Sequence, residues 1–240
     1  MVNLNIPDLI IIQKTKKPKK MKSKLFFPAI AILLIVFIGC TQQPKEAKKD
    51  SKSNTVQLFN GKDLTGWEQK NGTASYEVID GVIVGTTVLD SPNSFLCTVE
   101  DYADFILEFD VKVDTNLNSG VQIRSHSLTE FNNGRVHGYQ IEIDPSTRSW
   151  SGGIYDEARR GWLADLENNE AGRNAFKNGE WNHYKIEASG PSMKTWINGV
   201  PTAELIDSMD TEGFIALQVH SAPAAGRQVK WKNIKFELLD

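Results

Sequence analysis

The sequence predicts an all-β fold, an antiparallel sandwich of two sheets of the jelly-roll type. Short segments that alternate apolar and polar residues recur over residues 76–238, and turn sequences such as Asp80-Gly81 and Asn198-Gly199 separate them. Such alternation is typical of strands that bury one face, and many short strands between regular turns favour a sandwich or jelly roll. Helical periodicity is almost absent, and we expect only a turn or two of helix within residues 165–178.

Nine segments carry the strand pattern most clearly. We expect strands at residues 76–79, 82–84, 105–113, 121–124, 139–144, 183–188, 194–197, 214–220 and 229–238. Asn198-Gly199 predicts a two-residue type I′ hairpin, because both turn positions require positive φ. The apolar run around Cys97 also resembles a strand, so we expect a buried structural thiol there. Residues 56–240 are long enough for a single domain with one core.

Composition and charge exclude one class of partner. The chain has 240 residues, of which 40% are hydrophobic and 24% charged, which is ordinary for a globular protein. The formal net charge is −3, but seven Lys and one Asp place +6 on residues 1–39 and leave −9 on the remainder. Affinity for phosphate backbones comes from Lys and Arg, so we expect no nucleic-acid partner.

The N-terminal region is predicted to be a targeting signal. A basic start at Met21 precedes the uncharged residues 25–38, and Phe37-Ile38-Gly39-Cys40 resembles a bacterial lipobox. The resemblance implies a lipoprotein signal over residues 1–39 with its start at Met21, cleavage before Cys40 and a lipid on the Cys40 sulfur. Residues 40–55, poor in apolar side chains, would be a flexible tether. We therefore expect a lipid-anchored protein of the bacterial cell envelope, in the periplasm or on the surface; a plain signal anchor is the alternative.

Three predicted strands place polar side chains on one face. Because strand side chains alternate, residues two apart share a face, opposite an uninterrupted apolar face. A merely solvated face would explain this pattern, but such faces are usually built from interchangeable Lys, Glu and Thr. Amide, carboxylate, guanidinium and imidazole groups are what sugar hydroxyls require as partners. The polar set is Gln122 and Arg124, then Gln140, Glu142 and Asp144, then Gln218 and His220.

An aromatic-rich segment follows the second of these strands. Trp150, Tyr155 and Trp162 bracket what we expect to be a loop, and Asp156 and Arg160 lie within it. Aromatic rings stack on sugar rings, so this loop is a plausible rim for the polar face.

The chain resembles the 3-keto-disaccharide hydrolase family, long known as a domain of unknown function in bacterial lipoproteins. The resemblance implies a concanavalin A-like or laminin-G-like jelly roll with a carbohydrate site on its concave sheet. It also places Arg124, Glu142, Asp144, Tyr155, Gln218 and His220 at the polar motif positions of the family. Nine segments in order carry it: residues 58–67, 80–85, 118–124, 138–144, 153–155, 180–182, 198–199, 213–220 and 229–235.

The resemblance implies cleavage of 3-keto-glycosides, such as 3-keto-disaccharides. A base removes the C2 proton, the enolate expels the C1 substituent, and water adds to the product; this needs a base, an enolate stabiliser and an acid. We expect His220 or Glu142 to be the base, Arg124 the enolate partner, and Asp144 an orienting group or a metal ligand. A divalent metal is possible as cofactor, for which His126, Glu142 and His220 are allowable ligand types. The expected substrate-binding residues are Gln122, Gln140, Tyr155, Asp156, Arg160, Trp162 and Gln218.

Three alternatives stay open at this stage. Glu142 and Asp144 could act as the two carboxylates of an ordinary glycosidase, but two groups on one strand face, about 7 Å apart, do not easily flank a bond from opposite sides. A non-catalytic carbohydrate-binding module of a glycan-utilisation system would use the same amides and aromatic rings. A lipid-anchored scaffold would bind no sugar. The enzyme hypothesis in turn implies a partner, a sugar oxidoreductase that supplies the 3-keto substrate.

Overall fold

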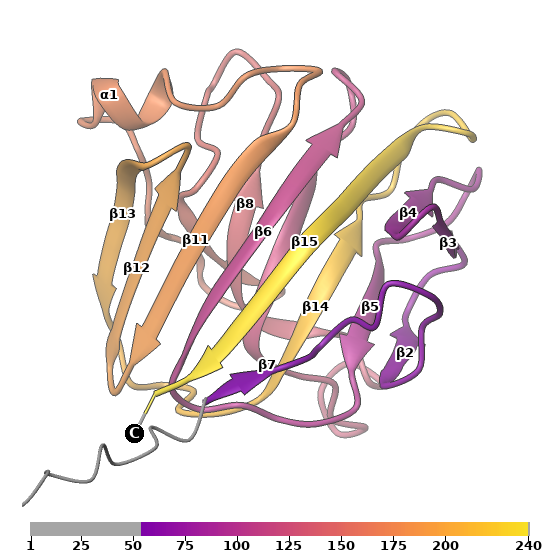
Figure 1. The fold of residues 1–240 in the computed structure, drawn as a ribbon, viewed down its shortest axis with the longest axis horizontal. Helices are drawn as coiled ribbons and strands as arrows, with labels where there is room; N and C mark the ends of the chain where they lie inside the picture. The colour runs from indigo at the N-terminus through magenta and orange to yellow at the C-terminus, as the bar shows by residue number, and fades with distance from the viewer. Residues whose placement is uncertain (1–53, 240) are drawn as a thin grey trace, which may run out of the picture. The chain divides into compact units, whose positions relative to one another are not determined.

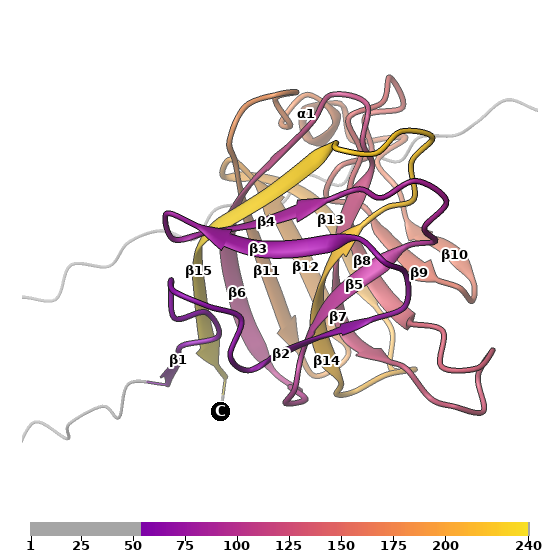
Figure 2. The same cartoon turned by 90° about the vertical axis from the view of Figure 1, so that its right-hand side faces the viewer.

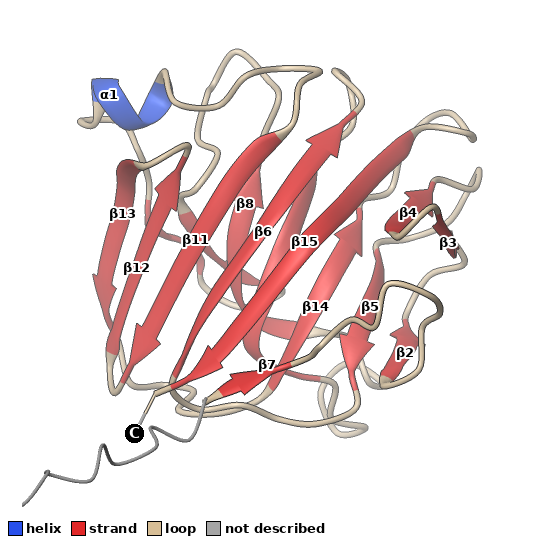
Figure 3. Ribbon diagram, in the orientation of Figure 1, coloured by secondary structure: helices blue, strands red, loops and turns tan. Residues whose placement is uncertain are grey.

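Two antiparallel β-sheets packed face to face form the fold (Figures 1 and 3). The computed structural model describes residues 54–239. Sheet A contains, in spatial order, β13 (Val200–Ile206), β12 (Ser192–Ile197), β11 (Asn182–Ser189), β6 (Phe105–Val113), β15 (Gln228–Leu238), β4 (Val82–Thr86) and β3 (Ser75–Ile79), and β1 (Thr55–Val56) pairs with β15. Sheet B contains β10 (Gly161–Ala164), β9 (Ile154–Glu157), β8 (His137–Ile143), β7 (Ser119–His126), β14 (Phe214–Val219), β5 (Ser94–Thr98) and β2 (Trp67–Lys70). Figure 2 views the sandwich from the edge where β3 and β4 lie across from β2 and β5.

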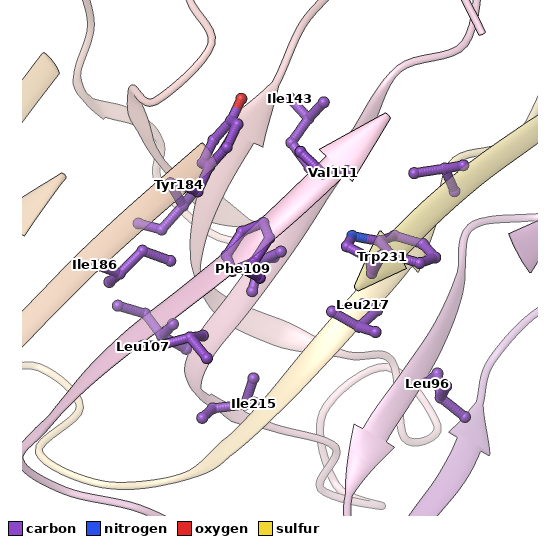
Figure 4. Close-up of a cluster of buried hydrophobic side chains, with 14 of the residues drawn as sticks. Leu96, Leu107, Phe109, Val111, Ile143, Tyr184, Ile186, Ile215, Leu217 and Trp231 are labelled. Carbon is purple, nitrogen blue, oxygen red and sulfur yellow. The ribbon is translucent and has the colours of Figure 1, made fainter. Parts of the chain in front are cut away.

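The core lies between the sheets and is built by alternation along the strands. In β6, every second residue from Phe105 to Val113 is buried, whereas the residues between them are only partly covered or exposed. Each large apolar side chain buried in this way contributes about 1.5–3 kcal/mol. Phe109 stacks on Tyr184 of the neighbouring strand β11, with ring centroids 5.2 Å apart. Figure 4 shows these rings with Trp231 of β15 and Leu217 of sheet B.

The two-sheet all-β prediction is confirmed, and all nine predicted segments contain strands. The single helix of the described residues, α1 (Glu170–Arg173), lies within the predicted segment 165–178. The hairpin at Asn198-Gly199 joins β12 to β13 with φ of 51° and 80°, as a type I′ turn requires. The prediction of a loop after the second polar strand is wrong for residues 154–164, which form the β9–β10 hairpin at the edge of sheet B.

The predicted signal, the tether up to residue 53 and the lipidation site Cys40 lie outside the described residues. Among residues 54–239, no helix is long and apolar enough to span a membrane.

The outer face of sheet B, which points away from sheet A, is partly covered. Its apolar half forms a second buried cluster in which Val136 packs with side chains of β5 and β14, namely Phe95, Cys97, Phe214 and Ala216. Val136 belongs to residues 127–136, which connect β7 to β8 and are called here the cover loop. The Asn71 side chain fastens this loop at both of its polar atoms, donating to the Gly134 carbonyl at 3.0 Å and accepting from the Val136 N–H at 2.7 Å. The β8–β9 half of the face is left open.

Candidate functional site

A cavity of about 340 Å³, called cavity 1, opens on the uncovered half of sheet B. Residues of β8 and β9 that are two apart provide its floor, because alternation turns them all outward. Gln140 lies directly across from Tyr155 in the strand register. The lining residues are Asn93, Asn118, Arg135, Gln140, Glu142, Arg148, Tyr155, Glu157, Trp162 and His220.

A chain of amides beneath cavity 1 ends on the Glu142 carboxylate. The Oε1 atom of Gln140 accepts from Nε2 of Gln122 at 2.7 Å and from Nε2 of Gln218 at 2.8 Å, and Gln140 Nε2 donates to Glu142 Oε2 at 2.9 Å. Gln122 and Gln218 are fully buried, so they orient Gln140 rather than line the cavity. Gly120 makes room for this chain, since a Cβ there would lie 2.5 Å from the Gln140 side chain.

Glu142 is buried yet heavily hydrogen-bonded. Besides Gln140, Asn118 Nδ2 donates to Glu142 Oε1 at 2.6 Å, and a guanidinium nitrogen of Arg148 lies 3.5 Å from the same oxygen. Burial raises the pKa of Glu142 above its ordinary value, and the hydrogen bonds oppose this without outweighing it. The carboxyl group is therefore held in place but is easier to protonate than an exposed glutamate.

Asp144 and two tryptophans hold the guanidinium of Arg148. Arg148 Nε donates to Asp144 Oδ2 at 2.8 Å. The Cζ atom of Arg148 lies 5.2 Å from the ring centre of Trp150 and 4.8 Å from that of Trp162. Burial raises the pKa of Asp144, but hydrogen bonds from Ser146 and Arg148 outweigh it and leave the pKa below the ordinary value. Asp144 does not line cavity 1; it positions an arginine that does.

Glu157 and His220 form the other end of cavity 1. Arg135 lies 3.6 Å from Glu157 Oε1, and burial raises the pKa of Glu157 although Arg135 and His220 oppose it. The Nδ1–H of His220 donates to the Ser221 carbonyl at 2.8 Å. Because a carbonyl can only accept, this bond leaves Nε2 as the unprotonated nitrogen of the neutral ring. Within residues 54–239 no group hydrogen-bonds to Nε2.

The expected position of Arg124 is wrong. It does not share the polar face with Gln122, and it does not line cavity 1. The pairing of β7 with β8 is irregular between Ile123 and His126, and Arg124 has a φ of 46°, so the alternation that would place it beside Gln122 is broken. Its buried guanidinium donates to three oxygens that belong to Ala103, Asp104 and Gly190, at 2.6–2.8 Å. Arg124 therefore joins chain segments rather than facing a substrate.

The expected positions of Asp156 and Arg160 are also wrong, because neither residue lines cavity 1. Asp156 lies between Tyr155 and Glu157 on β9, so it points to the opposite face, where it is fully buried. Both Arg159 and Arg160 donate to its carboxylate. The two arginines also bind carboxylates from the segment before β14, which completes the arginine–aspartate network of Asp156, Arg159, Arg160, Asp207 and Asp210. None of these five lines cavity 1.

The expected metal ligands do not come together. His126 Nε2 lies 3.4 Å from Asp210 of the arginine–aspartate network, whereas Glu142 and His220 line cavity 1. Among the described residues, no three His, Cys, Asp or Glu side chains are grouped so as to hold a metal ion.

Five lining residues were not predicted from the sequence. Two had a readable signal: Glu157 follows Tyr155 by two positions, and Asn118 precedes Gly120 and Gln122 with the same spacing. Alternation alone would have placed both on the face of the site. The others, Asn93, Arg135 and Arg148, come from segments outside the strands and are brought in only by tertiary folding.

Fold and cavity together define the class of the protein. It is a two-sheet jelly-roll domain with a polar cavity on the outer face of one sheet. The chain belongs to the 3-keto-alpha-glucoside-1,2-lyase-like domain family, which matches residues 54–237 and confirms the resemblance found in the sequence. Comparison with curated protein sequences finds no match.

Solved structures share the fold at low identity. A candidate glycosyl hydrolase from Parabacteroides distasonis ATCC 8503 is 22% identical, with a TM-score of 0.57 over 78% of this chain and 94% of the other. A Bacillus subtilis protein of unknown function with a galectin-like fold is 12% identical, with a TM-score of 0.57 over 73% and 90%. The carbohydrate binding module CBM66 from Bacillus subtilis is 17% identical, with a TM-score of 0.50 over 72% and 95%.

Proposed function

We propose that this protein cleaves 3-keto-glycosides in cavity 1, by eliminating the C1 substituent and then hydrating the product. One observation carries the proposal: two carboxyl groups with raised pKa, an imidazole with an open Nε2 and two arginines surround one cavity. Titratable groups perturbed in this way gather at catalytic sites. The family description, a 3-keto-alpha-glucoside-1,2-lyase-like domain, supports the same chemistry.

In this proposal His220 removes the proton from C2. A ketone at C3 makes that proton acidic because the resulting anion is an enolate. Nε2 of His220 is suited to accept it, since the bond from Nδ1 to Ser221 fixes the neutral tautomer with its lone pair on Nε2. Both oxygens of Glu142 already accept hydrogen bonds, from Asn118 and Gln140, so we do not assign it as the base. Each oxygen retains a second lone pair that can accept from a sugar hydroxyl, and we assign Glu142 to that role.

Two arginines and Glu157 take the remaining roles. Arg148, held by Asp144 and two aromatic rings, and Arg135 supply positive charge for the enolate oxygen. Burial raises the pKa of Glu157, which favours a protonated carboxyl group that can donate to the departing oxygen. The elimination breaks the C2–H and C1–O bonds and forms the C1=C2 bond; hydration then adds OH to C1 and H to C2.

The test is product release from a 3-keto-glucoside beside the unoxidised glucoside, using the full chain in detergent with and without a chelator. Cleavage of the keto substrate alone supports the proposal. Cleavage of the plain glucoside would instead favour ordinary glycosidase action. The chelator arm measures whether a divalent metal contributes.

A non-catalytic carbohydrate-binding module is the second candidate. The similarity of the fold to CBM66 and the amides and aromatic rings of cavity 1 favour it. Turnover of neither substrate, with sugar binding retained, would select it. In that case Glu142→Gln would weaken binding without affecting any reaction.

We also propose that the protein is anchored in the bacterial envelope through a lipid on Cys40. The motif Phe37-Ile38-Gly39-Cys40 supports it. Cys40→Ser should abolish incorporation of labelled fatty acid and release the protein from the membrane fraction; an unchanged membrane fraction would favour a plain signal anchor. The substrate itself requires a partner reaction, an oxidation of a glycoside at C3.

A further inference from the structure

A second cavity of about 620 Å³, called cavity 2, adjoins cavity 1. The two share four lining residues, Asn93, Arg135, Glu157 and His220. We propose that cavity 2 binds the leaving-group side of the substrate as a second sugar ring, an inference that rests on the proposed function. Both volumes fall in the range of about 300–1,000 Å³ typical of ligand pockets.

The chemistry of cavity 2 suits a sugar that does not react. Apart from the four shared residues, no charged side chain lines it. The amides of Asn132 and Asn133 have no hydrogen-bond partner among the described residues, so they are available to hydroxyl groups. Pro92, which is exposed, offers apolar surface to the C–H groups of a ring.

The cover loop that carries these amides is held in place by hydrogen bonds. Asn132 and Asn133 lie in the cover loop, and Asn71 holds the backbone of that loop next to them at Gly134 and Val136. Ser127 Oγ also donates to the Gly134 carbonyl at 2.6 Å. A site on such a loop is formed before the ligand arrives, which reduces the entropy cost of binding.

The charges decide which ring occupies which cavity. The ring that becomes an enolate needs a cation and positioned carboxyl groups, and cavity 1 has Arg148 and Glu142 in addition to the shared residues. The shared Glu157 and His220 lie at the junction, where the bond between the two rings would be broken. The oxidised ring therefore lies in cavity 1 and the departing sugar in cavity 2.

The test compares a 3-keto-disaccharide with the corresponding methyl 3-keto-glycoside, which leaves cavity 2 empty. The variant Asn132→Gly/Asn133→Gly removes both amides, and glycine adopts the positive φ of 45° and 56° without strain. We expect kcat/KM for the disaccharide to fall about tenfold, the loss of two neutral hydrogen bonds, and kcat/KM for the methyl glycoside to change less than about twofold.

The matched control is Asn233→Gly, the same change at a φ of 53° on β15, where the side chain bonds to Asp110 of sheet A. It should leave both substrates unaffected, and unfolding midpoints show that each variant folds. Equal losses on both substrates, or no loss on either, would overturn the proposal for cavity 2.

Calorimetry separates this inference from the proposed function. If the parent protein cleaves neither substrate, the proposed function fails. The affinities for the two substrates then test whether cavity 2 binds a second sugar ring. Tighter binding of the disaccharide than of the methyl glycoside, lost in the double variant, supports the second subsite. Equal affinities in the parent overturn it.

Discussion

Two clusters of arginine and carboxylate lie on opposite faces of β9, and they differ in how completely their charges are paired. In the arginine–aspartate network, Asp156 is bound by both Arg159 and Arg160, which also bind Asp210 and Asp207 respectively. In cavity 1 the pairing is incomplete. Glu157 pairs with Arg135 at 3.6 Å and has a hydrogen bond from Asn93, and no described residue hydrogen-bonds to Nε2 of His220.

The pKa directions show the same contrast. The guanidinium of Arg160 lowers the pKa of Asp207 from 3.8 to about 2, so this carboxylate stays charged. Burial raises the pKa of Glu142 and Glu157. Residue type alone therefore does not distinguish the structural ion network from the proposed reactive site; the incompletely paired donors and acceptors do.

The largest effect should come from His220→Asn. The asparagine amide can still donate to the Ser221 carbonyl, as Nδ1 of His220 does, but it has no basic nitrogen in place of Nε2. We expect turnover of a 3-keto-glycoside to fall by about 10²–10⁴-fold, the range for loss of a general base. The control His183→Asn, on sheet A beside Asp110, should retain activity. Full activity of His220→Asn would remove His220 from the base role.

Glu157→Gln should lower turnover by about 10²-fold and change its pH dependence. Because burial raises the pKa of Glu157, the parent should lose activity as rising pH removes the proton from this carboxyl group. A glutamine cannot lose that proton, so the alkaline limb of the rate profile that Glu157 causes should disappear.

Glu157→Gln should also change the stability of the protein. A carboxyl group with a raised folded pKa favours folding when protonated and opposes it once the pH exceeds its ordinary pKa. Glu157→Gln should therefore have an unchanged or higher urea midpoint at pH 7. A clearly lower midpoint would show that Glu157 is a structural ion partner like Asp207.

Trp162→Ala should raise KM about tenfold with a smaller effect on kcat. It removes a ring surface of cavity 1 and one of the two aromatic faces that hold Arg148. Trp196→Ala is the control, because Trp196 lies on sheet A next to Lys185. Steady-state kinetics should show no change for Trp196→Ala, and equal losses for both would indicate general destabilisation.

Asp207→Asn should have the smallest effect on activity, within about twofold, and should instead lower stability. Its depressed pKa contributes stability that is present above about pH 4 and lost as the pH falls toward 2. Because Asp207 is partly solvent-exposed, we expect about 1 kcal/mol at pH 7. Urea unfolding at pH 7 and pH 2.5 should show this difference and then its decrease; equal differences would contradict the charge argument.

Alternation could predict the fold and much of the site, because it is a property of single strands. It correctly separates Gln140 and Glu142 from the core residues Tyr139 and Ile141. It fails at Arg124, where a strand irregularity reverses the face and an arginine at positive φ carries no sequence signal.

Proximity between distant segments could not be predicted from the same pattern. Asn93 precedes β5 and Arg135 belongs to the cover loop, yet both border the two cavities. Arg135 is placed by the packing of the cover loop over sheet B, whereas Asn93 is placed beside the end of β14, where it accepts from the Ser221 N–H at 3.0 Å. Asp156 shows the opposite error, because the β9–β10 hairpin was expected to be a loop and alternation was not applied to it.

Asn71 holds the cover loop through main-chain atoms, and this has a consequence for how such a domain can diversify. An anchor on backbone groups does not depend on the side chains of residues 128–131, and at Asn132 and Asn133 only the positive φ restricts the residue type, chiefly to Asn, Asp and Gly. Substitutions there can accumulate without loss of the anchor or of the β8–β9 floor. Under the proposed function, relatives that keep the floor and differ at these positions would accept different sugars, so the tip of one loop could evolve separately from the reaction.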